Sequence, residues 1–217
     1  MLEWYTTDTG YLDSIVTTEE LLAELSKRNL DGNAASDLHP PFQRLSVQEA
    51  FSSFGKIDLA ECKSREDMIE QAKNVSVKTD PDDTWEEAFN RVFLSLVEPN
   101  LPRERALVLY DYPRQIPCLA QAKPNSPWSE RWELYARGVE IANCFTEERD
   151  PLHLKRFYEE EVKVFLQAER PINPDTELIE MIEKGFPRCS GVALGLDRLI
   201  MLLLDADGIE DVTSYQA

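Results

Sequence analysis

The stretch RWELYARGVEIANCF, residues 131–145, decides the fold of this chain. Apolar and polar side chains alternate on both sides of Arg137-Gly138, a dipeptide suited to a two-residue turn. We therefore expect a long β-hairpin. Upstream, RALVLYDYP (105–113) and IPCLAQA (116–122) each predict a strand, and downstream SGVALG (190–195) predicts a strand that leads directly into the apolar helix DRLIMLLL.

Helix-start signals dominate the first hundred residues. A Ser or Thr followed three positions later by an acid is typical of a capping box, which satisfies the free backbone amides of a first turn. Four such pairs precede apolar runs: Thr17–Glu20, Ser46–Glu49, Ser64–Asp67 and Thr84–Glu87. The last pair starts a longer helix that Pro99 ends, whereas residues 31–44 are polar and predict a loop.

Two more helices are expected after the hairpin, from Leu152 to Ala168 and from Asp175 to Lys184, where Gly185 stops the second one. Hairpin-linked strands with helices in blocks indicate an α+β fold on an antiparallel sheet, not a doubly wound parallel one. The sequence carries no Walker or Rossmann glycine pattern, which disfavours those nucleotide folds.

Composition narrows the class of protein. With 42% apolar and 29% charged residues, the 217-residue chain is typical of one globular domain. The net charge of −18 disfavours a broad nucleic-acid surface but allows a small basic pocket for a nucleotide. The N-terminus lacks a signal peptide and the longest apolar run, residues 199–204, cannot span a membrane. We expect a cytoplasmic protein with reduced, mostly buried cysteines.

Two acids on the predicted hairpin form the first candidate site. With the turn at residues 137–138, Tyr135 faces Glu140, and Glu133 lies two residues further along the same face. A diagonal cross-strand pair of this kind has backbone positions about 7–8 Å apart, so long Glu side chains can converge on a hard cation such as Mg²⁺. The alternative is two solvated acids on an open sheet face.

Three further candidates, Asn143, Phe145 and Glu147, continue along the same strand. Strict alternation places these odd positions on the face opposite Glu140. They share a site with Glu140 only if a β-bulge falls between Glu140 and Asn143. Without a bulge, Phe145 is a core residue and the other two lie at the rim.

The segment GVALGLDR, residues 191–198, is the third candidate. Small residues at Gly191, Ala193 and Gly195 allow a flat ligand to approach the backbone, and Arg198 in the first turn of a helix suits a phosphate. The alternative is a tight strand-to-helix junction in which Arg198 pairs with a neighbouring acid. The N-terminal alternation MLEWY also predicts a strand, and Glu3, if buried there, needs a partner such as a ligand ammonium or a lysine.

Together these segments resemble the catalytic domain of class II aminoacyl-tRNA synthetases of the lysyl type, and most closely the paralogues that attach β-lysine to elongation factor P. GVEIANCFTEERDP resembles the family's Glu-Asn-Phe-Glu segment, CSGVALGLDRLIML resembles motif 3, and MLEWY resembles the strand that closes motif 2. VEPNL and the P-x-x-x-P-x-L-A stretch from Pro113 to Ala120 also fit. The resemblance spans residues 1 to about 214.

The resemblance implies one incomplete antiparallel class II catalytic core over residues 1–217, flanked by helices, with the motif 2 end at 1–5, a helical insertion at about 17–100 and motif 3 at 190–204. It implies that Glu133 and Glu140 hold the Mg²⁺ that bridges ATP phosphates. It also implies that Arg198 contacts the γ-phosphate, with Gly195 beneath the adenine, so that Arg198 and Glu140 act in catalysis.

For the amino acid, the resemblance implies a pocket lined by six residues: Glu3, Tyr5, Asn143, Phe145, Glu147 and Ala193. Glu147 and Tyr5 would hold the side-chain ammonium. Ala193 matches the elongation factor P branch, where lysyl-tRNA synthetases usually have Gly, and its methyl would favour a β-amino acid. Glu148 and Arg149 depart from the family's Leu and Thr beside the pocket acid.

The family's motif 1 and the first strand of motif 2, which supply a dimer interface and an arginine on the α-phosphate, have no counterpart in this sequence. The sequence therefore predicts an ATP-dependent lysine or β-lysine ligase whose acceptor is a lysine of elongation factor P, with this chain weak or inactive alone. A miscalled start, a truncated gene and a domesticated fragment all remain open. Two alternatives are a non-catalytic module that binds an amino acid or nucleotide, or docks on a synthetase, and a lysyl-tRNA synthetase that acts on tRNA. A homodimer is expected for the full-length family.

Overall fold

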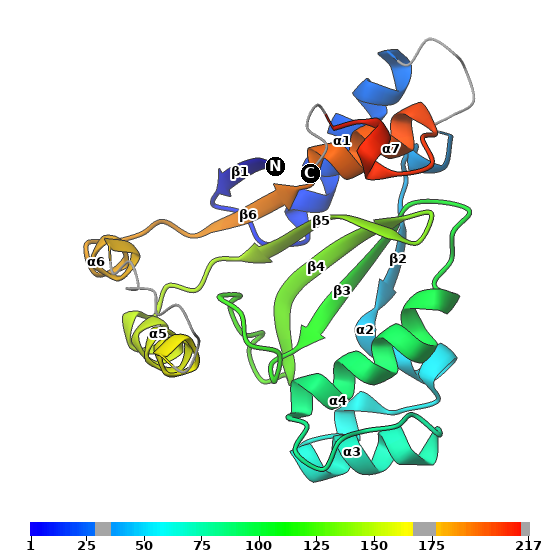
Figure 1. The fold of residues 1–217 in the computed structure, drawn as a ribbon. Coiled ribbons are helices and arrows are strands. Elements are labelled where there is room, and N and C mark those ends of the chain that lie inside the picture. The colour runs from blue at the N-terminus through cyan, green and yellow to red at the C-terminus, as the bar shows by residue number, and fades with distance from the viewer. Residues whose placement is uncertain (29–35, 167–176, 214–217) are drawn as a thin grey trace.

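Six strands form one sheet in the spatial order β1-β6-β5-β4-β3-β2 (Figure 1). This computed structural model describes residues 1–28, 36–166 and 177–213. Every neighbouring pair of strands is antiparallel except β2 and β3, which are parallel. The predicted antiparallel α+β fold is therefore confirmed. The strands are β1 (Leu2–Thr7), β2 (Gln43–Ser46), β3 (Leu107–Pro113), β4 (Trp128–Ala136), β5 (Val139–Thr146) and β6 (Cys189–Leu194).

Helices cover both faces of the sheet. Short π-helical turns at Phe51–Gly55 and Phe93–Val97 extend two of them, and the second run ends in a 3₁₀ turn at Glu98–Asn100 that contains Pro99, as predicted. Among the described residues, no helix is both long and apolar enough to cross a membrane. The α-helices are α1 (Asp13–Arg28), α2 (Val47–Ala50), α3 (Arg65–Asn74), α4 (Trp85–Val92), α5 (Pro151–Leu166), α6 (Glu177–Glu183) and α7 (Leu196–Leu204).

Three of the four predicted capping boxes are present, at the starts of α2, α3 and α4. The prediction at Thr17 is wrong, because α1 begins at Asp13, a full turn earlier. There the Asp13 carboxylate accepts the backbone amide of Gly10 at 2.8 Å, which closes a turn ahead of the helix. The predicted end at Ala168 and the predicted start at Asp175 lie outside the described residues.

Two strand predictions need correction. The stretch 116–122 forms only isolated bridges, from Ala120 to Glu147 and from Ala122 to Ser129, and Pro117 has no backbone N–H to donate to a ladder. Conversely, β2 lies partly inside the predicted loop 31–44 and pairs in parallel with β3. Its four residues carry too short a pattern to reveal a non-local pairing. Residues 29–35 of that predicted loop lie outside the described residues.

The two faces of the sheet carry separate cores. On one face, Leu107, Leu109 and Tyr135 are buried with α2, α3 and α4 and with the aromatic stack of Phe51, Phe89 and Phe93. On the other face, Trp132, Leu134, Ile141 and Val192 are buried with α1 and α7. The four cysteines are free thiols, and all but Cys118 are buried, as expected.

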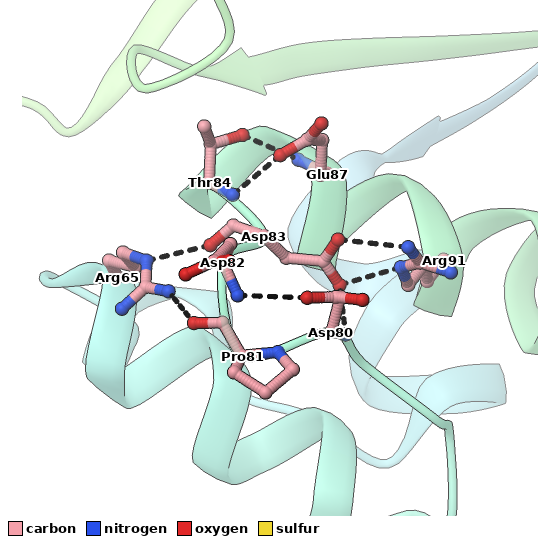
Figure 2. Close-up of polar contacts among 8 residues, drawn as sticks. All are labelled: Arg65, Asp80, Pro81, Asp82, Asp83, Thr84, Glu87 and Arg91. Atoms are coloured by element: carbon pink, nitrogen blue, oxygen red, sulfur yellow. Dashed lines mark hydrogen bonds and ion pairs between the residues drawn. The ribbon is translucent and has the colours of Figure 1, made fainter.

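A polar network fixes the corner between α3 and α4 (Figure 2). The Asp83 carboxylate accepts two hydrogen bonds from Arg91, at 2.6 and 2.9 Å, and Arg65 donates to the carbonyls of Asp83 and Pro81. Because Asp83 is only 4% exposed, these contacts satisfy a charge that would otherwise be costly to bury. The network makes this corner a structural support for α3 and α4.

Candidate active site

The hairpin of β4 and β5 turns at Arg137-Gly138, as predicted. Both residues have positive φ, 52° and 83°, which fits a type I′ turn. Arg137 is also held by ion pairs to Asp37 and Asp205, each at 2.7 Å. The turn sets the register so that Tyr135 pairs with Glu140, which matches the prediction.

Strand β5 contains a β-bulge directly after the second residue pair beyond the turn. Tyr135 pairs with Glu140 but Leu134 pairs with Ala142, so Ile141 is the extra residue on β5. Ile141 and Ala142 are both buried in the core on the α7 side. The bulge therefore puts Glu140 and Asn143 on the same face, which is the condition that the sequence left open.

Strand register then aligns the candidate residues in two rows. The first row runs from Glu3 through Ala193 and Asn143 to Glu133. The second row runs from Tyr5 through Gly191 and Phe145 to Arg131. Paired residues of antiparallel strands point to the same face, so both rows share one surface across β1, β6, β5 and β4.

A hollow of about 250 Å³ lies where β5 and β6 meet the start of α7. It is lined by Met1, Ile141, Ala142, Asp197 and Ile209 together with five of the predicted site residues: Glu140, Asn143, Ala193, Gly195 and Arg198. The other predicted residues, Glu3, Tyr5, Glu133, Phe145 and Glu147, lie on the same two rows or beside them, outside the lining of this hollow.

Arg198 points toward the hairpin. Its Nη1 donates to the backbone carbonyl of Glu140 at 2.8 Å and lies 3.7 Å from that residue's carboxylate oxygen Oε2. The pairing with a neighbouring acid, one of the two alternatives, is therefore present, and its partner is the proposed metal ligand. The guanidinium side chain is half exposed, which leaves donors free for a phosphate.

Glu133 is buried in a network of donors. Its Oε1 accepts from Arg131 at 2.6 Å, and its Oε2 accepts from Tyr112 at 2.5 Å and from Tyr135 at 2.8 Å. Burial and then the Glu133 charge raise the pKa of Tyr112 and Tyr135. Burial alone would lower the pKa of Arg131, yet Glu133 raises it. The carboxylate is thus held rigidly and is not one of two solvated acids.

Glu140 is half-buried, and burial and then the charge of Glu133 raise its pKa, against the effect of Arg198. Such a like-charge pair favours a divalent cation, because a cation would offset the repulsion. The described residues contain no cluster of three or more His, Cys, Asp or Glu side chains that could hold a metal. Two carboxylates fit Mg²⁺ as proteins usually bind it, with phosphate and water oxygens completing the shell.

Glu147 is the most unusual acid in the site. Burial raises its pKa from 4.5 to about 7. Its backbone amide donates to Cys189, but no hydrogen bond or ion pair within the described parts of the chain reaches its carboxylate. A half-buried carboxylate without a cation is a site for a positively charged group.

The N-terminal strand differs from the expectation of a buried acid. β1 is an edge strand, Glu3 is exposed and Tyr5 is 65% exposed, so Glu3 needs no buried partner. Partial burial and then the nearby Glu147 charge raise the pKa of Tyr5. Register still places Glu3 opposite Ala193 and Tyr5 opposite Gly191, at the edge of the same surface.

The departures from the family pattern beside Glu147 have a local explanation. Glu148 accepts the backbone amides of Arg149 and Asp150, at 2.7 and 3.0 Å, and pairs with His153 at 2.7 Å. These contacts direct its carboxylate to the start of α5 and away from Gly191. The exposed Arg149 follows it, so neither residue obstructs Glu147.

Sequence reasoning assigned no role to several residues that shape the site. Arg131 and Tyr112 hold Glu133, and a positive φ of 63° at Asp111 marks the β3 bulge that turns Tyr112 toward it. Glu98 is a third acid near Glu133, since burial and then that charge raise the pKa of Glu98. The sequence indicated only that Gly191 is small, and not that Glu147 and Tyr5 lie over it. Predicting these contacts would have required predicting the bulge in β3, and no pattern in the YDYP stretch indicates a bulge.

Comparison with known proteins agrees with this architecture. The family of class II tRNA synthetases for D, K and N matches residues 1–217. The lysine–tRNA ligase of Pelotomaculum thermopropionicum is 34% identical over 226 residues, which cover 99% of this chain and 44% of that protein. The elongation factor P–(R)-β-lysine ligase of Vibrio atlanticus is 33% identical over 223 residues, which cover 99% of this chain and 64% of that protein.

The corresponding ligase of Haemophilus ducreyi is 31% identical over 217 residues, with 99% and 63% covered. The chain thus spans about half to two thirds of the length of these curated relatives. Both kinds of relative are named as ligases of lysine or β-lysine, and they differ in the acceptor, tRNA or elongation factor P. On the extent of the match and the fold, this chain belongs to the class II tRNA synthetase family of the D, K and N type.

Proposed function

We propose that this chain is the catalytic part of an ATP-dependent ligase that activates lysine or β-lysine as an adenylate and transfers it to a lysine of elongation factor P. The observation that carries the proposal is Glu147: a half-buried carboxylate with a pKa raised to about 7 and no cation among the described residues. A substrate ammonium would supply the missing charge. Residues 1–217 form one domain in this proposal, with residues 17–100 inserted.

In this proposal, the substrate lies across β5 and β6 with its ammonium at Glu147 and Tyr5 and its carboxylate near the hollow beside Asn143 and Ala193. Phe145, between the two ends on β5, provides an apolar wall for the methylene chain. Glu3 lies at the outer edge, opposite Ala193, where it can receive the substrate's second ammonium, the one nearer the reacting carboxylate.

ATP would bind at the hollow with its adenine over Gly195, where no side chain projects, and its γ-phosphate at Arg198. Adenylation requires little proton transfer, because the substrate carboxylate attacks the α-phosphate and pyrophosphate leaves. The residues therefore act by positioning and by stabilising charge. Glu133 and Glu140 would hold Mg²⁺, which neutralises charge on the phosphate oxygens when bound.

The network around Glu133 supports this assignment of roles. Three donors fix that carboxylate, while Glu140 has only Arg198 near it. Glu133 would serve as the rigid support and Glu140 as the adjustable ligand. Arg198 would then exchange its contact with the Glu140 carboxylate for a phosphate, and keep the 2.8 Å hydrogen bond to the Glu140 carbonyl.

The net charge of −18 favours a protein acceptor over tRNA, because a negatively charged chain repels a phosphate backbone. Ala193 supports the same branch, because its methyl lies beside Asn143 at the reacting end. The lysyl-tRNA synthetase reading is the second candidate. A transfer assay with labelled β-lysine distinguishes the two, since label on elongation factor P supports the first and label on tRNA supports the second.

Calorimetry with lysine and (R)-β-lysine, together with ATP–pyrophosphate exchange, tests the activation step. Binding accompanied by exchange supports the ligase. Binding without exchange supports a non-catalytic module that keeps the pocket. The matched variants are Glu147→Gln, which removes the proposed ammonium partner, and Glu148→Gln, whose carboxylate instead contacts the backbone ahead of α5 and His153. Equal binding by both variants would contradict the proposed role of Glu147.

A further inference from the structure

Gly191 lies in the middle of β6, where the side chains of Glu147 and Tyr5 converge over its α-carbon. A Cβ atom added there would lie 2.6 Å from Glu147 Oε1 and 2.8 Å from Tyr5 Cε1. Both distances are far below van der Waals contact, so the carboxylate and the ring would have to move. The space above Gly191 is therefore already filled by the two groups proposed to hold the ammonium.

Backbone conformation does not require glycine at this position. Gly191 pairs with Tyr5 on β1 and with Phe145 on β5 in an ordinary ladder, and it does not have the positive φ of Gly138 and Gly185. Position 191 must lack a side chain only because the side chains of Glu147 and Tyr5 pack against the sheet there. That makes Gly191 a determinant of where the Glu147 carboxylate lies.

Ala193, two residues along the same strand, marks the other end of the surface. It pairs with Asn143 and lines the hollow beside Arg198. Positions two apart on a strand share a face and lie about 6.5 Å apart. The Cα-to-Nζ distance of an extended lysine is also about 6 Å from ordinary bond lengths. β-Lysine has the same six-carbon chain, so its terminal ammonium reaches equally far from the carboxylate.

We infer that Gly191 determines the length of the substrate: it lets Glu147 and Tyr5 lie one strand repeat from the reacting end, where they accept a six-carbon diamino acid and reject shorter ones. This inference rests on the proposed function and concerns the same pocket. A side chain at position 191 displaces the Glu147 carboxylate from this place, so the distance from the ammonium site to the reacting end no longer fits lysine. Shortening the acid at position 147 draws the carboxylate back toward its own backbone, at the level of Cys189, and favours homolysine.

The test measures binding of lysine, (R)-β-lysine, ornithine and homolysine to the full chain by calorimetry at pH 8, where the Glu147 carboxylate is ionised. One methylene in a fitted pocket typically changes affinity by about 10- to 200-fold. Wild type should prefer lysine over ornithine by at least the lower bound, and Gly191→Ala should abolish that preference. The matched control is Ser190→Ala, one position earlier, whose hydroxyl faces Ser14 and Thr9 on the opposite side.

The outcomes separate this inference from the function on which it rests. If wild type binds neither lysine nor β-lysine, both fall. If wild type discriminates by length and Gly191→Ala keeps the same ratio while folded, only the role of Gly191 is overturned. If Gly191→Ala shows no cooperative melting, Glu147→Asp decides: a shift toward homolysine supports the inference, and an unchanged ratio overturns it.

Discussion

The sheet face that carries Glu133 is covered at one end and open at the other. Under β3 and β4, Leu109 and Tyr135 are buried in the core that contains α2, α3, α4 and the aromatic stack of Phe51, Phe89 and Phe93. Along β5, β6 and β1, the same face presents Asn143, Gly191 and Tyr5, which are half-buried or exposed. The covered half holds one carboxylate immobile with three donors, whereas the open half leaves another carboxylate without a partner.

The difference shows how one surface serves both stability and binding. Tight burial around Glu133 supplies hydrogen bonds that offset the cost of a buried charge. At Glu147 the same cost is not offset within the described residues, and its pKa rises to about 7. A group that the fold leaves unsatisfied marks where a ligand belongs. Four changes, taken in order of expected size, would break or sharpen this contrast.

The largest effect is expected in the covered half. Phe89→Ala removes a fully buried ring stacked 4.6 Å from Phe51, which should lower the free energy of unfolding by about 3–5 kcal/mol. Urea denaturation measures this loss in the free energy of unfolding. The control Leu94→Ala changes a side chain that is 59% exposed on the same helical run and should cost far less. Equal losses would contradict the assignment of this core.

The next effect concerns the rate of adenylation and not the stability of the fold. Relative to the weak ATP–pyrophosphate exchange expected of this chain, Arg198→Ala should lower the rate by a further factor of about 10²–10³, since one preorganised charged donor is lost. The midpoint of thermal unfolding should change little, because the side chain is half exposed. The control Arg44→Ala removes an exposed arginine on β2. A loss of exchange in both variants would show a general charge effect.

Tyr112→Phe tests the rigid support. It removes one of the three donors to Glu133, and a hydrogen bond to a charged group is worth about 1.5–3 kcal/mol. We expect that loss in the free energy of unfolding together with weaker Mg²⁺-dependent nucleotide binding. Tyr110→Phe, two positions earlier on β3, is the matched control. A Tyr112 variant with unchanged stability would mean that Arg131 and Tyr135 suffice to hold the acid.

The effect placed last, because solvent screens the half-buried Glu147 carboxylate, is a pH dependence. The pKa of Glu147 rises from 4.5 to about 7 on folding, so the folded state binds its proton more tightly than the unfolded state. The free energy of unfolding should therefore fall as pH rises between these values, and Glu147→Gln should remove that contribution. Thermal melting from pH 4 to pH 8 measures it.

A ligand ammonium should reverse this shift. Lysine binding near pH 6.5 should release a proton from wild type, because the cation favours the ionised carboxylate. Calorimetry in buffers of different ionisation enthalpy counts the released protons. Glu147→Gln provides the comparison, and proton release that persists in this variant would assign the linkage to another group.

Much of this architecture could be predicted from local patterns. The alternation around Arg137-Gly138 and the caps at Ser46, Ser64 and Thr84 indicated the hairpin and three helix starts, because each depends on contacts within a few residues. The strand before Arg198 and the helix that carries it followed from small residues ahead of an apolar run. Thr17 failed since the Gly10–Asp13 turn starts that helix earlier.

Tertiary structure alone decided what surrounds the site. The bulge at Ile141, the parallel pairing of β2 and the convergence of Tyr112 and Arg131 on Glu133 depend on partners far apart in the chain or on a single inserted residue. A side-chain pattern with a period of two cannot show an extra residue until both strands are paired. The types of the site residues could therefore be read from the sequence. Their shared face, their burial and the space above Gly191 exist only once the sheet has formed.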